Sequence, residues 1–377
     1  MVSGLTGMFD AAACPRLIVK VGSSLLVGPD GAVRRDWLTS LVADIAARHR
    51  DGQEIAIVSS GAIALGARRL QLPKGGRASL EDAQAAAATG QIALSQVWAE
   101  LLAAEGLTAA QILVTLDDLE DRRRYLNASA TLARLLALRV VPVINENDSV
   151  ATEEIRFGDN DRLAARVAQA AGAQGVILLS DIDGLYDANP NSHPQARLIE
   201  HVARIDAGIE AMADGGSTSG MGSGGMISKI SAAKIATAAG VQLAIISGKH
   251  QHPLARFAET GRGTVFAATG AARARKAWLA GRLTARGAIT VDAGAVAALA
   301  AGKSLLAAGA TRVEGEFRRG DLIAIHAPDG RPIARGLAEY DAGDAARIAG
   351  RRSAEHAAIL GYAPRATLVH RSHMAML

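Results

Sequence analysis

Short aliphatic runs alternate with longer helical patterns through about the first 268 residues, and this alternation limits the fold more than any other feature of the chain. Several of the short runs are apolar at every position, which is typical of strands covered on both faces. The alternation predicts repeated βαβ units, and therefore an α/β fold with an open, mainly parallel sheet between helix layers. The predicted strands are residues 17–21, 54–59, 111–115, 140–144, 175–180 and 241–247.

The segments between these runs have the periodicity of amphipathic helices. In residues 35–50 four apolar side chains fall on one helical face, and Gly52 follows as a stop signal. Residues 159–171 and 228–239 show the same kind of pattern. We expect these segments to be the helices that cross between parallel strands. The four apolar positions of the first helix are Leu38, Leu41, Val42 and Ile45.

The composition is that of a globular chain. Of the 377 residues, 49% are apolar and 21% are charged, which excludes global disorder and allows two or three domains. The single cysteine, Cys14, cannot form an internal disulfide, and no Cys and His residues have zinc-site spacing, so a reducing cytoplasm is the expected location. The longest apolar stretches, such as residues 293–301, fall short of the roughly 20 residues that a membrane-spanning helix needs.

The pattern of the sequence changes beyond residue 281. Residues 271–276 read AARARK, without apolar periodicity, and are predicted to begin a linker. Short alternating pieces punctuated by glycine follow, and Asp329-Gly330 between two of them is a hairpin signal. We therefore expect a small all-β barrel. The predicted divisions are an N-terminal extension (1–15), a main domain (16–270), a linker (271–284), the barrel (285–366) and a C-terminal tail (367–377).

Two turns rich in serine and glycine follow the first two predicted strands. Lys20 lies in the first strand, and residues 22–24 (GSS) come directly after it. The second strand ends in residues 59–61 (SSG) and leads into a helix. Each turn alone is more often purely structural, but backbone N–H groups at the carboxyl edge of a parallel sheet are well placed to bind an anion. Two such turns at one edge strengthen that interpretation.

A third glycine-rich segment, residues 219–234, runs from a loop into a helix. Lys229 lies in the first turn of this helix, where the helix dipole disfavours a positive charge unless an anion lies nearby. A flexible surface loop is the alternative interpretation. The segment matches neither GxxxxGK[ST] nor a strand followed by GxGxxG, so both common nucleotide fingerprints are excluded.

Acidic and amide side chains gather at two further strand ends and one helix start. Helix capping and turn formation explain one or two of these positions but not the whole group. Carboxylates, amides, two lysines and glycine loops at strand ends are what phosphoryl transfer requires, because it needs Mg²⁺, cations and backbone donors. The residues are Asn145, Glu146, Asn147, Asp148, Asp159, Asn160, Asp161, Ser180, Asp181 and Asp183.

These motifs occur in an order that resembles the amino acid kinase family. They are VKVGSS, VSSGAIALG, PVINEND, FGDND, LLSDIDGLYD and GSGGMISK, and together they cover about residues 16–268. The segments GAITVDAGA, KSLLAAGATRVEGEF, RGD and IARGLAEY resemble the PUA domain that many bacterial members carry. The departures are small: the extension through Cys14, and Ser180 where threonine is more common.

The resemblance implies ATP-dependent phosphorylation of the γ-carboxylate of L-glutamate, which gives the acyl phosphate that opens proline biosynthesis. By position, Lys20 and Lys229 would lie beside the transferred phosphoryl group, and Asp161 would hold both lysines. Glutamate would contact Ser60, Asp148 and Asn160. The ATP site would comprise Lys20, Gly22, Ser180, Asp181, Ser223, Gly224, Gly225, Met226, Ile227, Ser228 and Lys229.

The resemblance also implies a cofactor and partners. ATP would enter with Mg²⁺, for which the sequence identifies no direct protein ligand. Members of the family usually form dimers or tetramers, and feedback inhibition by proline near the glutamate site is a further expectation. A glutamyl phosphate reductase is a candidate recipient of the product, whereas no membrane partner is expected.

Other interpretations stay open at this stage. Within the fold, the acceptor could be aspartate, N-acetylglutamate or UMP. N-acetylglutamate has no ammonium for Asp148 to bind, and UMP would require more arginine near the acceptor. The PUA domain could instead bind RNA, but its acidic residues offset its basic ones, and phosphate contacts need a cationic face. Assembly or regulation is the preferred role for that domain.

Overall fold

The computed structural model describes residues 2–28, 31–150, 160–190, 192–214, 225–268 and 285–377 of the chain. It divides into two compact units. The first comprises residues 1–120 and 127–270, and the second comprises residues 121–126 and 271–377. Each unit has its own sheet and its own hydrophobic core.

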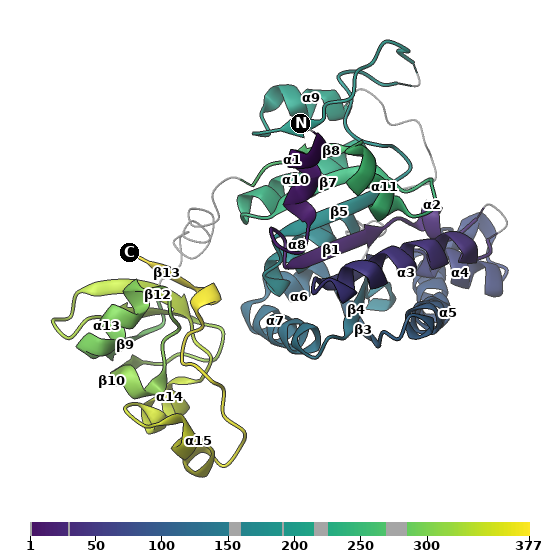
Figure 1. The fold of residues 1–377 in the computed structure, drawn as a ribbon. Coiled ribbons are helices and arrows are strands. Elements are labelled where there is room, and N and C mark those ends of the chain that lie inside the picture. Colours follow the sequence, from purple (N-terminus) through teal and green to yellow (C-terminus); the bar gives the residue numbers. More distant parts are fainter. Residues whose placement is uncertain (1, 29–30, 151–159, 191, 215–224, 269–284) are drawn as a thin grey trace. The chain divides into compact units, whose positions relative to one another are not determined.

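The first unit is built on an eight-stranded sheet in the order β3-β4-β2-β1-β5-β7-β8-β6 (Figure 1). The described strands pair in parallel except for β7 with β8. The predicted mainly parallel sheet is confirmed, and each predicted run is a strand whose ends differ by two residues or fewer. The strands are β1 (Arg16–Val21), β2 (Glu54–Ser59), β3 (Ala109–Val114), β4 (Val141–Glu146), β5 (Gly175–Ser180), β6 (His201–Val202), β7 (Gln242–Ser247) and β8 (Thr264–Phe266).

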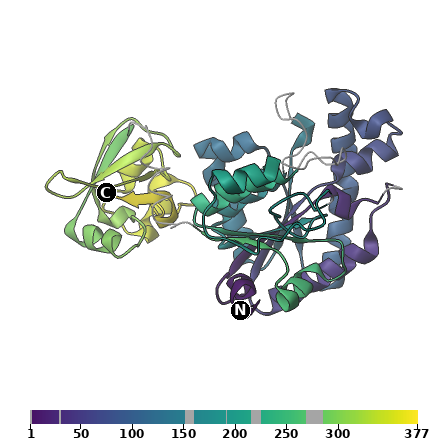
Figure 2. The same ribbon diagram turned by 90° about the horizontal axis from the view of Figure 1, so that it is seen from above.

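Helices cover both faces of this sheet (Figures 1 and 2). On one face α3 packs on β2, α5 and α11, and on the other α8 packs on β1, β2, β4 and β5 and against α10. The helix predicted over residues 35–50 is confirmed in full as α3. The described helices up to residue 260 are α1 (Val2–Thr6), α2 (Ser23–Leu26), α3 (Arg35–Arg50), α4 (Ala62–Arg69), α5 (Leu80–Ala104), α6 (Leu116–Glu120), α7 (Arg122–Ala137), α8 (Asn160–Ala171), α9 (Ala207–Asp214), α10 (Met226–Ala238) and α11 (Pro253–Thr260).

Alternate side chains of β1 point to opposite faces of the sheet. Leu17, Val19 and Val21 are fully buried in the core that α3 and α5 cover, together with Trp98. Lys20 points to the opposite face, because successive side chains of a strand alternate between faces, and there it forms an ion pair with α8. One strand therefore supplies both the core and a functional side chain.

The residues before β1 belong to the same core. Phe9 and Cys14 are fully buried, and Nε2 of Gln53 donates to the backbone carbonyl of each, over 2.9 and 2.6 Å respectively. Burial raises the pKa of the Cys14 thiol to about 12, so the thiol stays neutral near pH 7. The segment predicted as an N-terminal extension thus contributes to the packing of the first unit.

Two glycines allow α4 and α5 to cross with their backbones in contact. A Cβ atom on Gly66 would lie 1.8 Å from the carbonyl oxygen of Ala86, and one on Gly90 would lie 1.8 Å from that of Ala62. Only glycine fits at these two positions without a shift of backbone. Because α4 begins directly after Ser60 and the glycine that follows it, the crossing fixes α5 against the turn after β2.

The second unit contains a five-stranded sheet in the order β10-β9-β11-β12-β13 (Figure 1). Strands β11 and β12 form the hairpin expected around Asp329-Gly330, and Gly330 has a φ of +82°. Helices α13 (Ala293–Ala300), α14 (Ala342–Ile348) and α15 (Ser353–Leu360) accompany the sheet, which the alternating sequence pattern did not indicate. The strands are β9 (Gly287–Val291), β10 (Ala310–Gly315), β11 (Leu322–His326), β12 (Pro332–Leu337) and β13 (Met374–Met376).

The last residues of the chain form part of this second sheet. β13 pairs antiparallel with β12, and Leu368 and Val369 are buried in the core of the unit. Residues 367–377, predicted as a C-terminal tail, therefore contribute to the sheet and the core of the second unit. In the part of the chain that the structure describes, no helix has both the length and the apolar character needed to cross a membrane.

We predict that Gly90→Ala destabilises the protein by about 1–3 kcal/mol, because the added methyl group would overlap the Ala62 carbonyl oxygen. Gly343→Ala in α14 is the control, since a Cβ atom there would meet nothing within 4 Å. That change is expected to be neutral or slightly stabilising. Denaturant unfolding of both variants makes the comparison, and an unchanged midpoint for Gly90→Ala would contradict the backbone contact.

Candidate active site

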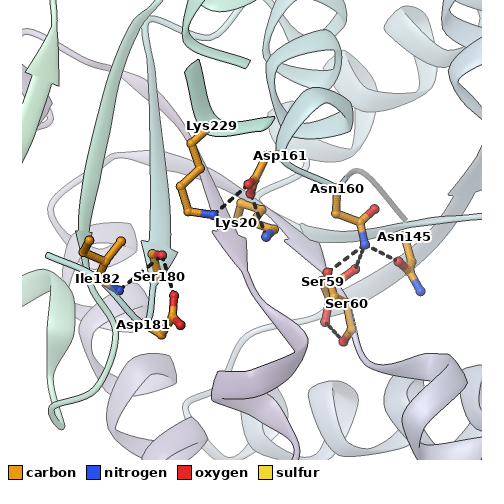
Figure 3. Close-up of polar contacts among 10 residues, drawn as sticks. All are labelled: Lys20, Ser59, Ser60, Asn145, Asn160, Asp161, Ser180, Asp181, Ile182 and Lys229. Atoms are coloured by element: carbon orange, nitrogen blue, oxygen red, sulfur yellow. Dashed lines mark hydrogen bonds and ion pairs between the residues drawn. The ribbon is translucent and has the colours of Figure 1, made fainter. Parts of the chain in front are cut away.

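Polar residues singled out in the sequence, among them Lys20, Ser60 and Ser180, gather at the carboxyl edge of the first sheet (Figure 3). Strand β1 lies between β2 and β5, and all three are parallel, with Lys20 in register with Val58 and Leu178. Because parallel strands end at one edge, the turns that follow them lie side by side. Ser60 after β2 therefore lies on one side of Lys20, and Ser180 at the end of β5 lies on the other.

A buried carboxylate holds two lysines at the centre of this edge. Nζ of Lys20 lies 2.6 Å from Oδ1 of Asp161, and Nζ of Lys229 lies 2.9 Å from Oδ2 (Figure 3). The Asp161 side chain is only 1% exposed. The three residues come from β1, from the first turn of α8 and from the first turn of α10. The expectation that Asp161 contacts both lysines agrees with this geometry.

The charges of the three groups are strongly coupled. Burial alone would raise the pKa of Asp161, but the positive charges of Lys20 and Lys229 and the hydrogen bonds that both donate outweigh it and lower the pKa to about 2. The carboxylate is therefore ionised near pH 7. Two ammonium groups around one carboxylate leave an excess of positive charge, which favours an anionic ligand.

A group of amides and hydroxyls lies on the β2 and β4 side of the lysines. Nδ2 of Asn160 is 2.7 Å from Oγ of Ser60, 3.2 Å from Oδ1 of Asn145 and 3.3 Å from the carbonyl oxygen of Ser59 (Figure 3). Asn145 and Asn160 are 2% and 4% exposed. The side-chain amide of Asn160 is thus held in one position, next to the hydroxyl of Ser60.

Asp148 follows β4 and begins a short 3₁₀ turn, Asp148–Val150. The side chain is half-buried. Burial raises its pKa to about 6, and the nearby positive charge of Arg77 only partly opposes that shift. A carboxylate that is costly to ionise in the free protein gains most from a cationic partner.

The β5 side of the lysines carries a different set of groups. Oγ of Ser180 donates to Oδ1 of Asp181 over 3.1 Å and accepts from the backbone N–H of Ile182 over 3.4 Å (Figure 3). On the turn after β1, a Cβ atom added to Gly22 would lie 3.8 Å from Nζ of Lys20, so this turn runs beside the lysine. The Ser180 hydroxyl and the turn after β1 therefore lie on the β5 side of the lysine pair.

The described part of the glycine-rich segment lies at the start of α10. Gly225 is the residue before the helix, and the first turn contains Met226, Ile227 and Ser228 ahead of Lys229. Ile227 is 53% exposed, whereas Lys229 is 7% exposed. Three further residues of the sequence motifs, Ser223, Gly224 and Asp159, lie outside the described residues.

Within the described residues, no group of three or more His, Cys, Asp or Glu side chains could hold a metal ion. The Asp161 carboxylate is engaged by two lysines. Both oxygens of the Asp161 carboxylate therefore face ammonium groups, and Mg²⁺ in proteins is commonly bound through few carboxylates together with substrate phosphates and water.

Two residues of α5 support the site and were not found from the sequence. Oε1 of Gln91 accepts a hydrogen bond from Nδ2 of Asn145 over 2.8 Å, and Nε1 of Trp98 donates to Oγ of Ser59 over 2.9 Å. A polar Gln91 on an otherwise apolar helical face is the signal that could have indicated it.

The chain matches two protein families in succession. Residues 15–247 match the amino acid kinase family, and residues 287–360 match the PUA domain.

The chain is also similar along its length to bacterial proteins named glutamate 5-kinase. It is 70% identical over 370 residues to that of Sphingopyxis alaskensis, covering 98% of this chain and 100% of the relative. It is 64% identical over 376 residues to that of Novosphingobium aromaticivorans, covering 100% of both chains. For that of Zymomonas mobilis the identity is 62% over 370 residues, covering 98% of this chain and 93% of the relative.

We predict that Asp161→Asn destabilises the protein above pH 4 by several kcal/mol, because two buried lysines would lose their counter-charge. In the wild type, the depressed pKa of Asp161 contributes about 2 kcal/mol to the free energy of unfolding. This contribution is fully present above about pH 4 and is lost as the pH falls through about 2. The difference in unfolding free energy between wild type and variant should therefore shrink from pH 4 to pH 2.

The control for this experiment is Glu100→Gln, which breaks the exposed ion pair with Arg35. Solvent and salt screen such a pair, so little change in stability is expected. If the difference between wild type and Asp161→Asn stays constant over the same pH range, the carboxylate does not carry the charge described here.

Proposed function

The chain belongs to the amino acid kinase family, and we propose that it transfers the γ-phosphoryl group of ATP to the γ-carboxylate of L-glutamate. The product is L-glutamyl 5-phosphate, and the reaction is the first step of proline biosynthesis from glutamate. The full-length similarity to proteins named glutamate 5-kinase supports this function. In the structure, the observation that carries it is the pair of lysines held by Asp161 between two different polar groups.

The reaction does not require the protein to remove a proton from the acceptor. An unperturbed Glu carboxyl titrates near pH 4.3, so the acceptor is already an anion near pH 7 and needs no general base. One γ-carboxylate oxygen forms a bond to the γ-phosphorus, and the bond from that phosphorus to the β,γ-bridging oxygen breaks. ADP leaves with the electron pair of that bond, and the acyl phosphate remains.

Lys20 and Lys229 supply positive charge at the point of transfer. They screen the phosphate oxygens from the approaching carboxylate and stabilise the loose, in-line transition state. Asp161 does not contact the substrates in this mechanism; it holds both ammonium groups in place. Preorganisation of this kind lowers the barrier because the charges need not move during the reaction.

Glutamate binds on the β2 and β4 side, against Ser60, Asn160 and Asp148. The hydroxyl of Ser60 and the amide of Asn160 are already 2.7 Å apart in a fixed arrangement. Asp148 pairs with the α-ammonium of glutamate, which lowers the cost of ionising its half-buried carboxyl.

ATP binds on the β5 side. Lys20 in β1 and Gly22 directly after it would line the site, together with Ser180 at the end of β5 and Asp181 after it. The start of α10 would add Gly225, Met226, Ile227, Ser228 and Lys229, with Ser223 and Gly224 as further candidates. Mg²⁺ would enter as part of the ATP complex, because Mg²⁺ usually binds through few protein groups together with substrate phosphate oxygens and water. When bound, it neutralises charge on the β- and γ-phosphates.

Further partners follow from the same assignment. Proline is the proposed feedback inhibitor, a glutamyl phosphate reductase is the proposed recipient of the product, and a dimer or tetramer in the cytoplasm is the proposed state. We assign the PUA domain to assembly or regulation rather than to RNA binding. Aspartate and N-acetylglutamate are less suitable acceptors than glutamate, the latter because it offers Asp148 no ammonium.

A panel of carboxylate acceptors with MgATP, in which hydroxylamine traps the acyl phosphate, tests the assignment. Glutamate should give the hydroxamate far faster than aspartate or N-acetylglutamate. A preference for either of the other acceptors would overturn it.

We predict that Lys229→Met lowers kcat by about 100-fold or more while the KM for glutamate changes little, because its charge is needed mainly as the phosphoryl group leaves ADP. Steady-state kinetics on the folded variant measure both constants. Lys234→Met in the same helix, at an exposed lysine paired with Glu210, is the control. An unchanged kcat in Lys229→Met would remove this lysine from the mechanism.

We predict that Asp148→Asn raises the KM for glutamate by about 10- to 100-fold and leaves the KM for ATP unchanged, since it removes a charged hydrogen bond to the ammonium. The preference for glutamate over glutarate, which lacks the ammonium, should fall by the same factor. A preference equal to that of the wild type would defeat the recognition role.

The pH dependence of the same constant gives a second test of Asp148. Because its carboxyl has a pKa of about 6 in the free protein, it gains a proton as the pH falls from 7 to 5. The KM of the wild type for glutamate should rise over that interval, whereas that of Asp148→Asn should stay high and flat. Parallel profiles for the two proteins would assign the titration to another group.

A further inference from the structure

A series of buried hydrogen bonds joins helix α5 to the glutamate side of the site, and we propose that Gln91 in this helix is a positioning residue for glutamate recognition. The inference rests on the proposed function, because it concerns the same site. Gln91 is 9% exposed and lies in the middle of α5, beside the glycine that touches the backbone of α4. It does not belong to the set of residues expected to touch a substrate.

The backbone N–H of Glu146 fixes the direction of this series. It donates to Oδ1 of Asn145 over 2.9 Å, so Nδ2 of that amide faces α5. Nδ2 in turn donates to Oε1 of Gln91 over 2.8 Å. Since a backbone N–H can only donate, a reversed Asn145 amide would set two donors against each other. Gln91 therefore stabilises the one orientation that satisfies both neighbours.

The series continues from Asn145 to the substrate side. Its Oδ1 also accepts from Nδ2 of Asn160 over 3.2 Å, and Nδ2 of Asn160 lies 2.7 Å from Oγ of Ser60 (Figure 3). Both asparagines are almost fully buried. The position of the Ser60 hydroxyl thus depends on two amides, the first of which is held by Gln91.

Helix α5 has little freedom to shift beneath this series. Gly90 contacts the backbone of α4 so closely that a Cβ atom there would lie 1.8 Å from the carbonyl oxygen of Ala62. Two turns after Gln91, Trp98 donates to Oγ of Ser59 over 2.9 Å. The Gln91 amide is also held at its other end, where Nε2 donates to Oγ of Ser95 over 3.2 Å. Gln91 is therefore a fixed acceptor.

Loss of this acceptor would affect the two substrates unequally. Nδ2 of Asn145 would be left buried without its partner, and the amide could recover a hydrogen bond only by moving away from Asn160. Glutamate recognition through Asn160 and Ser60 would weaken. The groups on the β5 side take no part in the series, because β1 lies between them and β2.

The test is the kinetics of Gln91→Leu. The KM for glutamate should rise about tenfold, the factor that corresponds to about 1.4 kcal/mol, while the KM for ATP and the kcat stay within about threefold of wild type. Gln91→Glu keeps an acceptor oxygen in place and should recover most of the loss. The matched control is Gln96→Leu, the same change on the exposed face of α5, where Gln96 contacts Glu100.

A double-mutant cycle shows whether Gln91 acts through Ser60. In a Ser60→Ala background, Gln91→Leu should add little to the KM for glutamate, because the end of the series is already missing. Full additivity would overturn the proposal. So would a glutamate KM within twofold of wild type in Gln91→Leu, or equal rises for glutamate and ATP.

The stabilisation that glutamate gives against thermal unfolding supplies a readout that does not depend on turnover. Gln91→Leu should need about tenfold more glutamate than wild type for the same increase in Tm, whereas an unchanged requirement would contradict the proposal. A wild-type protein that forms no hydroxamate from glutamate would refute the proposed function itself. Normal wild-type activity with an unaffected Gln91→Leu variant would refute the role of Gln91 alone.

Discussion

The ion triad of Lys20, Asp161 and Lys229 is the interaction on which the rest of the site depends. A carboxylate that is 1% exposed between two ammonium groups is stable only when both partners are in place, because burial penalises each charge separately. The triad therefore links β1, α8 and α10, which are far apart in the sequence. It also leaves an excess of positive charge where a phosphoryl group would pass.

The order of the strands explains how one edge presents two different sets of polar groups. Because β1 lies between β2 and β5, the lysine pair has the amide and hydroxyl group of the β2 and β4 side on one flank. The Ser180 turn lies on the other flank. The glycine contact between α4 and α5 then fixes a second layer of side chains beneath the first flank. The flank on which we place glutamate is thereby supported by the crossing of α4 and α5, which lies away from the Ser180 turn.

The strands and the central residues were predictable from the sequence because they carry strong local signals. Apolar runs ending in Gly, Ser, Asn or Asp placed Lys20, Ser60 and Ser180 at one edge, as the structure does. Gln91 was not predictable, because its role depends on a helix crossing that no periodicity reveals. Helix α13 of the second unit was missed for a different reason: it is rich in alanine and has no polar face to mark it as amphipathic.

The most direct test of the account is the affinity for ADP with aluminium fluoride, a mimic of the phosphoryl group in transfer, in the presence of glutamate and Mg²⁺. The account predicts that the wild type binds this combination about 100-fold or more tighter than ADP alone, as transition-state mimics do. Lys20→Met should bind ADP nearly as well as wild type but lose most of that gain. An undiminished gain in Lys20→Met would contradict the claim that the lysine pair held by Asp161 stabilises phosphoryl transfer.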